Sequence, residues 1–180
     1  AAAAEAAMPP MATYVLGLLR KGPEWSPERS PRVDSLQAGH MANMRKMWEA
    51  GRLVLAGPVD ARDDLRGIWV FRADSAAEVS EMCGRDPSVR AGRLNVDLMT
   101  WWAPVGIGDG YRARLGRPGV KPDSMVARWL VLLKRGPKWS PQPDAGLQRA
   151  HVTHILSRVA DGSSPAAGPV ESADDLAALA

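Results

Sequence analysis

An internal repeat constrains the fold of this chain more than any other feature of its sequence. The string LLRKGPEWSP at residues 18–27 returns as LLKRGPKWSP at residues 132–141, which begins 114 residues further on. Two more pairs follow in the same order, LQAGH with LQRAH and AGPVDARDDL with AGPVESADDL, each pair 111 residues apart. Solenoid repeats have periods of about 20–50 residues, so this spacing predicts two tandem copies of a whole domain.

The two copies are expected to differ in completeness. Residues 12–104 form the complete first domain, and residues 105–125, rich in Gly and Pro, form a linker with an irregular surface path. Residues 126–180 form a partial second domain, with a first strand, a loop, a helix and an AGP strand, but without a counterpart of Asp86. Two interpretations stay open: a truncated version of a longer chain, which is favoured, or a half-domain docked on the first copy.

Hydrophobic patterning divides the first copy into four strands and two helices. The predicted strands are residues 13–20, 52–58, 67–74 and 93–102, and the predicted helices are residues 33–50 and 75–84. Ser75 and Glu78 have capping-box spacing, and Asp86 before Pro87 suits the N-cap of a short helical turn. The order β-α-β-β-α-β is typical of a ferredoxin-like α+β domain, with both helices on one face of an antiparallel sheet. A second sheet from the duplicated domain is expected to cover the other face.

Composition excludes several classes of protein. The chain is 46% hydrophobic and 24% charged, as in folded domains, and its charge of +3 is too diffuse to indicate a nucleic-acid partner. No apolar run approaches the roughly 18 residues that a membrane span needs. A single cysteine excludes an intrachain disulfide. His151 and His154 lack a third metal ligand, and no nucleotide-binding motif is present, so no cofactor or metal is predicted.

The alanine-rich start leaves the localisation open. Residues 1–7 resemble the small-residue tail around a signal-peptidase site, which would indicate export. The alternative is a cytoplasmic protein that begins at Met8 or Met11.

The segment from His40 to Trp102 carries a specific combination of motifs. It contains a helix histidine, a strand ending in AGP, a serine-capped helix, Asp86-Pro87 followed by Ala-Gly, and a closing strand with tryptophans. In this combination the chain resembles the YCII-related (YciI-like) domain family of uncharacterised bacterial proteins. The resemblance implies a ferredoxin-like fold that assembles as a dimeric α/β barrel, and a pocket in which a histidine and an aspartate face each other.

His40 and Asp86 are therefore the candidate catalytic residues. An imidazole exchanges protons near neutral pH, and a carboxylate beside it orients the ring and stabilises its charged form. The resemblance implies a cofactor-independent small-molecule enzyme of lyase or isomerase type, with an unknown substrate. The alternative is a non-catalytic ligand-binding or assembly module, in which His40 is a packed helix histidine and Asp86 only a helix N-cap.

Six further residues are expected to shape the pocket: Gly57, Pro58, Trp25, Arg93, Trp139 and His151. The Gly-Pro pair ends a strand at the rim, and the arginine would hold an anionic group, although a surface arginine is the default interpretation. Each tryptophan either closes over an apolar ligand or plugs the interface between two sheets, and His151 is the repeat of His40. The expected partner is a small molecule, not nucleic acid or membrane, bound by a pseudo-dimer within one chain or by a homodimer.

Overall fold

The computed structural model describes residues 9–61, 63–115, 117–119, 127–140, 142, 144–164 and 166–171. The expectations for the alanine-rich start and for the continuation of the second AGP segment past residue 171 lie outside these residues. Within the described part, no helix is long and apolar enough to cross a membrane.

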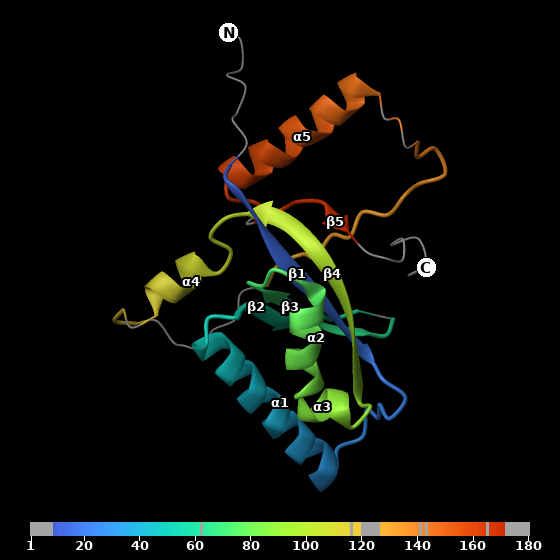
Figure 1. Ribbon diagram of the computed structural model, residues 1–180, viewed down its shortest axis with the longest axis vertical. Helices are drawn as coiled ribbons and strands as arrows, with labels where there is room; N and C mark the ends of the chain where they lie inside the picture. Colours follow the sequence, from blue (N-terminus) through green and yellow to red (C-terminus); the bar gives the residue numbers. More distant parts are fainter. Residues whose placement is uncertain are drawn as a thin grey trace.

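One antiparallel sheet of five strands organises the protein (Figure 1). The elements are β1 (Met11–Lys21), α1 (Pro31–Glu49), β2 (Leu53–Pro58), β3 (Leu65–Phe71), α2 (Ala76–Gly84), α3 (Pro87–Arg90), β4 (Leu94–Pro104), α4 (Asp109–Arg114), α5 (Ala145–Ala160) and β5 (Val170–Glu171). The strand order is β2-β3-β1-β4-β5, and every neighbouring pair is antiparallel. The first four strands have the ferredoxin-like order, which confirms the predicted α+β fold.

Local capping explains where the two long helices of the first domain begin. The Ser30 hydroxyl accepts a hydrogen bond from the amide of Val33 at 3.2 Å, so α1 starts at the following proline. Ser75 caps α2 in the same way, as the sequence predicted, by accepting from the amide of Glu78 at 3.3 Å. The second half of the predicted capping box does not form, because the Glu78 carboxylate pairs with Arg52 instead.

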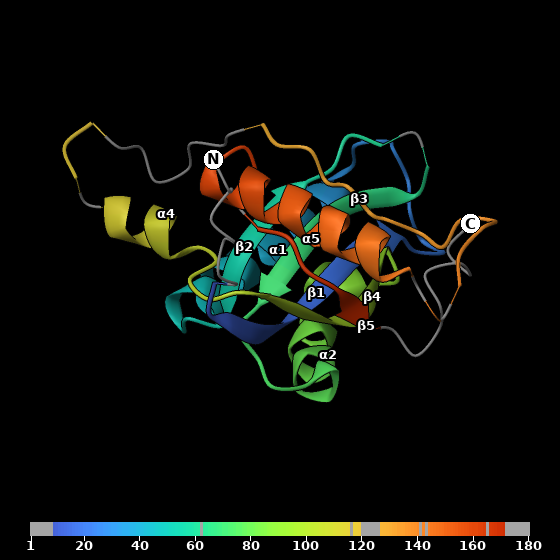
Figure 2. The ribbon, with the colours of Figure 1, turned by 90° about the horizontal axis from the view of Figure 1, so that it is seen from above.

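The helices α1, α2 and α3 lie on one face of the sheet, where they close a hydrophobic core (Figures 1 and 2). Val15 and Trp69 from the central strands are at most 1% exposed there, and Met47 of α1 and Val79 of α2 pack over them. Burial of each such side chain contributes about 1.5–3 kcal/mol. This layer fixes the inner face of α1, on which His40 lies.

The opposite face of the sheet differs from the prediction. Leu16, Leu18 and Val70 are buried there, but no second sheet covers them in the described residues. The cover comes from single segments that bring in Leu132 and Val170, and β5 joins the existing sheet beside β4.

The first strand predicted for the second copy does not form, since residues 127–136 contain no strand. The strand they repeat, β1, lies between two partner strands, β3 and β4. In the described residues, the repeated segment has neither of these partners, and a strand without a ladder partner leaves its backbone groups unpaired. Sequence similarity to a central strand is therefore not sufficient to form one.

The predicted linker and the predicted second helix also take definite places. Residues 105–125 are not irregular throughout, because Asp109–Arg114 form α4, which the Arg72–Asp109 ion pair ties to the end of β3. The helix predicted around the LQRAH motif is present as α5. Val152 and Leu156 of α5 face Trp102 across a small apolar groove, so α5 lies at the far end of β1 and β4 from α3 (Figure 1).

Candidate functional site

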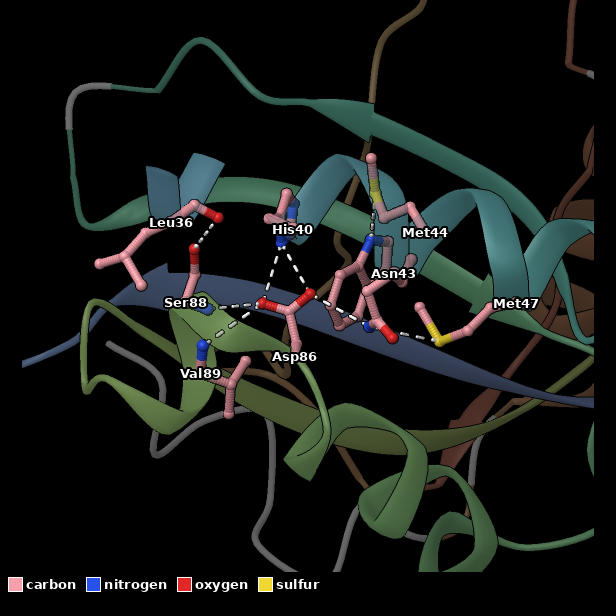
Figure 3. Close-up of polar contacts among 9 residues, drawn as sticks. Leu36, His40, Asn43, Met44, Met47, Asp86, Ser88 and Val89 are labelled. Carbon is pink, nitrogen blue, oxygen red and sulfur yellow. Dashed lines mark hydrogen bonds and ion pairs between the residues drawn. The ribbon is translucent and has the colours of Figure 1, made fainter. Parts of the chain in front are cut away.

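A histidine and an aspartate from distant parts of the chain meet between α1 and α3. The Nδ1 atom of His40 lies 3.1 Å from each carboxylate oxygen of Asp86 (Figure 3). His40 comes from the middle of α1, and Asp86 is the N-cap of α3, so two helices hold the pair. The Asp86 residue is 0% exposed and His40 is 8% exposed, so the pair is sheltered from bulk water.

The carboxylate of Asp86 accepts hydrogen bonds from three more groups. Its Oδ1 atom accepts from the amides of Ser88 at 2.9 Å and Val89 at 3.4 Å, which is the N-cap geometry of α3. Its Oδ2 atom accepts from Nδ2 of Asn43 at 3.1 Å (Figure 3). The carboxylate is therefore held in one orientation by its own helix and by α1.

These contacts keep Asp86 ionised. Burial on its own would raise the pKa of Asp86, but hydrogen bonds from His40, Asn43 and the Ser88 amide, together with attraction to the His40 ring, outweigh it. The net effect places the pKa of Asp86 below its ordinary value. Because an ionised carboxylate only accepts hydrogen bonds, the proton between the two side chains belongs to Nδ1 of His40.

The other ring nitrogen of His40 is left available. In the neutral ring, a proton on Nδ1 makes Nε2 an acceptor. Among the residues that the structure describes, no hydrogen bond reaches Nε2 of His40. The ring stacks on the buried indole of Trp69, with centroids 5.4 Å apart and planes at 19°. Packing against the indole and hydrogen bonding to Asp86 thus fix the imidazole, while Nε2 has no hydrogen bond to the described residues.

Three residues of this site, Asn43, Ser88 and Trp69, were not predicted from the sequence. Asn43 is three positions after His40, so the two share a face of α1, and a polar residue on that otherwise apolar face was a usable signal. Ser88 joins α3 to α1, since its hydroxyl donates to the carbonyl of Leu36 at 3.3 Å. Trp69 lies in the middle of a buried strand, where the sequence alone cannot tell a core residue from one beneath a histidine.

The repeated KGPEWSP loop packs beside the α3–β4 turn. The Gly22 amide donates to the carbonyl of Arg93, and the Glu24 amide donates to the carbonyl of Gly92, both at 2.9 Å. A Cβ at position 22 would overlap the carbonyl oxygen of Gly92, which explains the glycine of this motif. The Trp25 ring then packs against the helix-side core, under the guanidinium of Arg93 at 4.3 Å. Trp25 and Arg93 are thus neighbours, at the end of the turn that Asp86 begins.

A cavity of about 160 Å³ opens between this loop, the start of α1 and the α3–β4 turn. Glu24, Ser26, Arg32, Val33, Leu36, Ala91 and Arg93 line it. Leu36 precedes His40 by one helical turn on the same face, so the cavity lies next to the His40–Asp86 pair along α1.

Four other predicted pocket residues lie elsewhere. Gly57 and Pro58 end β2 at the edge of the sheet and do not line this cavity. His151 is exposed on α5, and Trp139 is 50% exposed with the Arg135 guanidinium 4.0 Å from its ring centre. Within the described part of the chain, neither His151 nor Trp139 makes a hydrogen bond or ring contact with the His40–Asp86 pair.

The described residues contain no cluster of three or more histidine, cysteine or acidic side chains that could hold a metal ion. The lone cysteine, Cys83, is buried in the core.

Fold and site together define a class: a ferredoxin-like α+β domain with a buried histidine–aspartate pair between its first helix and the turn before its fourth strand. Residues 18–102 match the YCII-related domain family. The match covers just under half of the chain, and no second copy is detected. Of the two predicted copies, only the first is matched by this family model.

No curated protein matches the chain. Among solved structures, it is similar to 5-chloro-2-hydroxyhydroquinone dehydrochlorinase (TftG) from Burkholderia phenoliruptrix AC1100 in complex with 2,5-dihydroxybenzoquinone. The identity is 19% and the TM-score 0.35, over 48% of this chain and 90% of that chain.

Proposed function

We propose that this YCII-related protein is a cofactor-independent enzyme that transfers a proton within a small molecule, as lyases and isomerases do. One observation carries the proposal: buried, ionised Asp86 holds Nδ1 of His40 and leaves Nε2 without a partner in the described residues. A histidine in this arrangement is oriented and electrostatically supported for general acid–base work.

The chemistry follows from the roles of the two side chains. Nε2 of His40 accepts a proton from an acidic C–H or O–H bond of the substrate, and the ring becomes an imidazolium. The negative charge of Asp86 stabilises that cation, with little screening because the pair is buried. In an elimination the leaving group departs with the bonding electrons, and in an isomerisation Nε2 returns the proton to a second atom. Catalysis by such a base typically contributes about 10²–10⁴-fold to the rate.

The proposal includes a second, partial YCII-like unit, which the repeated sequence supports. Residues 126–180 are a partial YCII-like unit after a linker at residues 105–125, since α5 carries the LQRAH motif and the second AGP motif docks on β4. In this arrangement the chain is a pseudo-dimer of the dimeric α/β-barrel type, and a homodimer is the alternative. Analytical ultracentrifugation distinguishes the pseudo-dimer from the homodimer, because a purely monomeric species excludes the homodimer.

The test of the catalytic role is His40→Ala on a substrate found by metabolite screening. Turnover should fall by about 10²-fold or more, while the circular dichroism spectrum stays that of the wild type. His151→Ala is the matched control, because it removes an exposed histidine in the repeat of the same motif and should leave turnover unchanged. Full activity of the His40→Ala protein would refute the proposal.

One observation favours a second function, a ligand-binding or assembly module without catalysis. Asp86 is the N-cap of α3 and is fully satisfied by His40, Asn43 and the Ser88 amide, so a structural role accounts for its burial. In this case a bound metabolite would be recovered chemically unchanged after incubation with the wild-type protein. Its affinity would also survive the His40→Ala substitution.

A further inference from the structure

The cavity beside the His40–Asp86 pair holds two arginines and one acidic residue. Arg32 comes from the first turn of α1, Arg93 follows the α3–β4 turn, and Glu24 belongs to the repeated loop. These three side chains sum to one net positive charge. The cavity as a whole is thus suited to a ligand with a negative charge.

The two guanidinium groups have no acidic partner among the described residues. Among the residues that the structure describes, neither the Arg32 nor the Arg93 side chain makes an ion pair or hydrogen bond. Arg20 and Arg72, by contrast, are paired with aspartates. Arg93 is only partly exposed, so its charge is partly removed from water, and no acidic side chain of the described residues pairs with it.

Arg93 lies over the ring of Trp25. Its guanidinium carbon is 4.3 Å from the ring centre, a cation–π contact. Because no described residue accepts a hydrogen bond from its N–H donors, these donors can make a bidentate bond to a carboxylate. The loop that holds Trp25 is fixed by backbone hydrogen bonds to Gly92 and Arg93, so this donor is positioned before a ligand arrives.

The remaining walls limit the size and character of the ligand. Val33, Leu36 and Ala91 provide apolar surface opposite the charged groups, and Ser26 adds a hydroxyl. The volume of about 160 Å³ is close to that of a cavity that binds benzene, about 150 Å³. This space is large enough for a single six-membered ring or a short branched chain.

The helix α1 relates the cavity to the reactive histidine. Arg32, Leu36 and His40 are spaced by four residues, so they lie on one face of α1. At about 1.5 Å per residue, Leu36 is roughly 6 Å and Arg32 roughly 12 Å from His40 along the axis. Leu36 therefore lies between Arg32 and His40 along α1, and it lines the cavity, whereas His40 does not.

We propose that this cavity is the substrate-recognition subsite, and that its ligand is a compact monocarboxylate with an apolar body, held by Arg93 and Arg32. The claim that this ligand is the substrate rests on the proposed function, but the binding itself does not. Arg93 acts here as a binding residue, and Arg32 supplies a second positive charge at the cavity mouth.

Benzoate and benzamide form a matched pair of probes for this subsite, since they differ in charge and hardly in shape. Titration followed by ¹H–¹⁵N NMR should show benzoate shifting the indole N–H of Trp25 and the amide of Ser26. Benzamide should bind about tenfold more weakly or worse, because it cannot make the charge-assisted bidentate bond. In the Arg93→Gln protein, benzoate affinity should fall by about tenfold, to the level of benzamide.

Arg90→Gln is the control, because it removes the same charge from an exposed position of α3 that does not line the cavity. It should leave benzoate affinity within about twofold of the wild type. Equal affinity for the two probes, shifts that avoid the cavity, or equal losses in the two variants would each overturn the proposal. These readouts measure binding and need no turnover, so the two proposals can fail separately. If benzoate binds as expected but the His40→Ala variant keeps full activity, only the catalytic function is refuted. Absence of binding with a catalytic His40 would refute only the subsite.

Discussion

The substitution Asp86→Asn tests whether charge, rather than shape, holds the candidate site together. The two side chains have nearly the same size, and asparagine is about as good an N-cap as aspartate. The hydrogen bond from the Ser88 amide is therefore retained. What changes is the bonding to His40 Nδ1 and Asn43 Nδ2, each 3.1 Å from a carboxylate oxygen of Asp86.

The magnitude follows from these two bonds. A buried hydrogen bond to a charged group contributes about 1.5–3 kcal/mol, against about 1 kcal/mol for a neutral one. Loss of the charge at two bonds should therefore lower the free energy of unfolding by about 2 kcal/mol at pH 7. Asp34→Asn, in the first turn of α1, removes an exposed ion pair with Arg29 and should cost less than about 0.5 kcal/mol.

The dependence on pH distinguishes this effect from simple misfit. The pKa of Asp86 in the folded protein is below its ordinary value, so the carboxylate stabilises the fold at pH values above the unfolded pKa of about 3.9. That contribution is lost as the pH falls through the lower folded pKa. The difference between wild type and Asp86→Asn should accordingly shrink below about pH 4.

Urea unfolding followed by tryptophan fluorescence, at pH 7 and at about pH 3, measures both quantities. The slope of the free energy with urea should be unchanged, because the substitution does not alter the surface exposed on unfolding. A loss under about 0.5 kcal/mol at pH 7 would refute the charge argument. A loss of the same size at both pH values would show that misfit, and not charge, is responsible.

Cys83 and Gly168 give two further, independent tests of the fold. Burial raises the pKa of Cys83 to about 12, so almost no reactive thiolate is present in the folded protein at pH 8. A thiol reagent should therefore react only as fast as the protein unfolds, and rapid reaction of the native state would contradict this. Gly168→Ala places a Cβ against the carbonyl oxygen of Trp102, so the β4–β5 pairing should open and the Trp102 amide should exchange faster with solvent. Gly136→Ala, which has open space around it, is the control, and identical exchange in the two variants would refute the docking of β5.

The predicted parts of the site are those whose signals are local. Asp86 before Pro87 indicated a helix N-cap, and that cap is observed at α3. His40 was identified through a family resemblance and not through its position on the helix. The polar side chain of Asn43 on the inner face of α1 was a usable signal, but its partner could not be predicted, because the bond to Asp86 joins residues 43 positions apart.

The sequence by itself determined the order of the strands and helices in the first domain and the residues that cap them. Period-two and helical hydrophobic patterns and capping side chains act within a few residues, so they can be interpreted without knowledge of the fold. The internal repeat predicted a first strand for the second copy as well, but residues 127–136 form no strand.

Only the tertiary structure decided that outcome, because a strand forms when a neighbouring strand accepts its hydrogen bonds. It also decided that β5 extends the first sheet instead of starting a second one. The contacts of His40 with Trp69 and of Arg93 with Trp25 likewise depend on which distant segments the core brings together. These contacts depend on packing between elements, which local patterns along the chain do not encode.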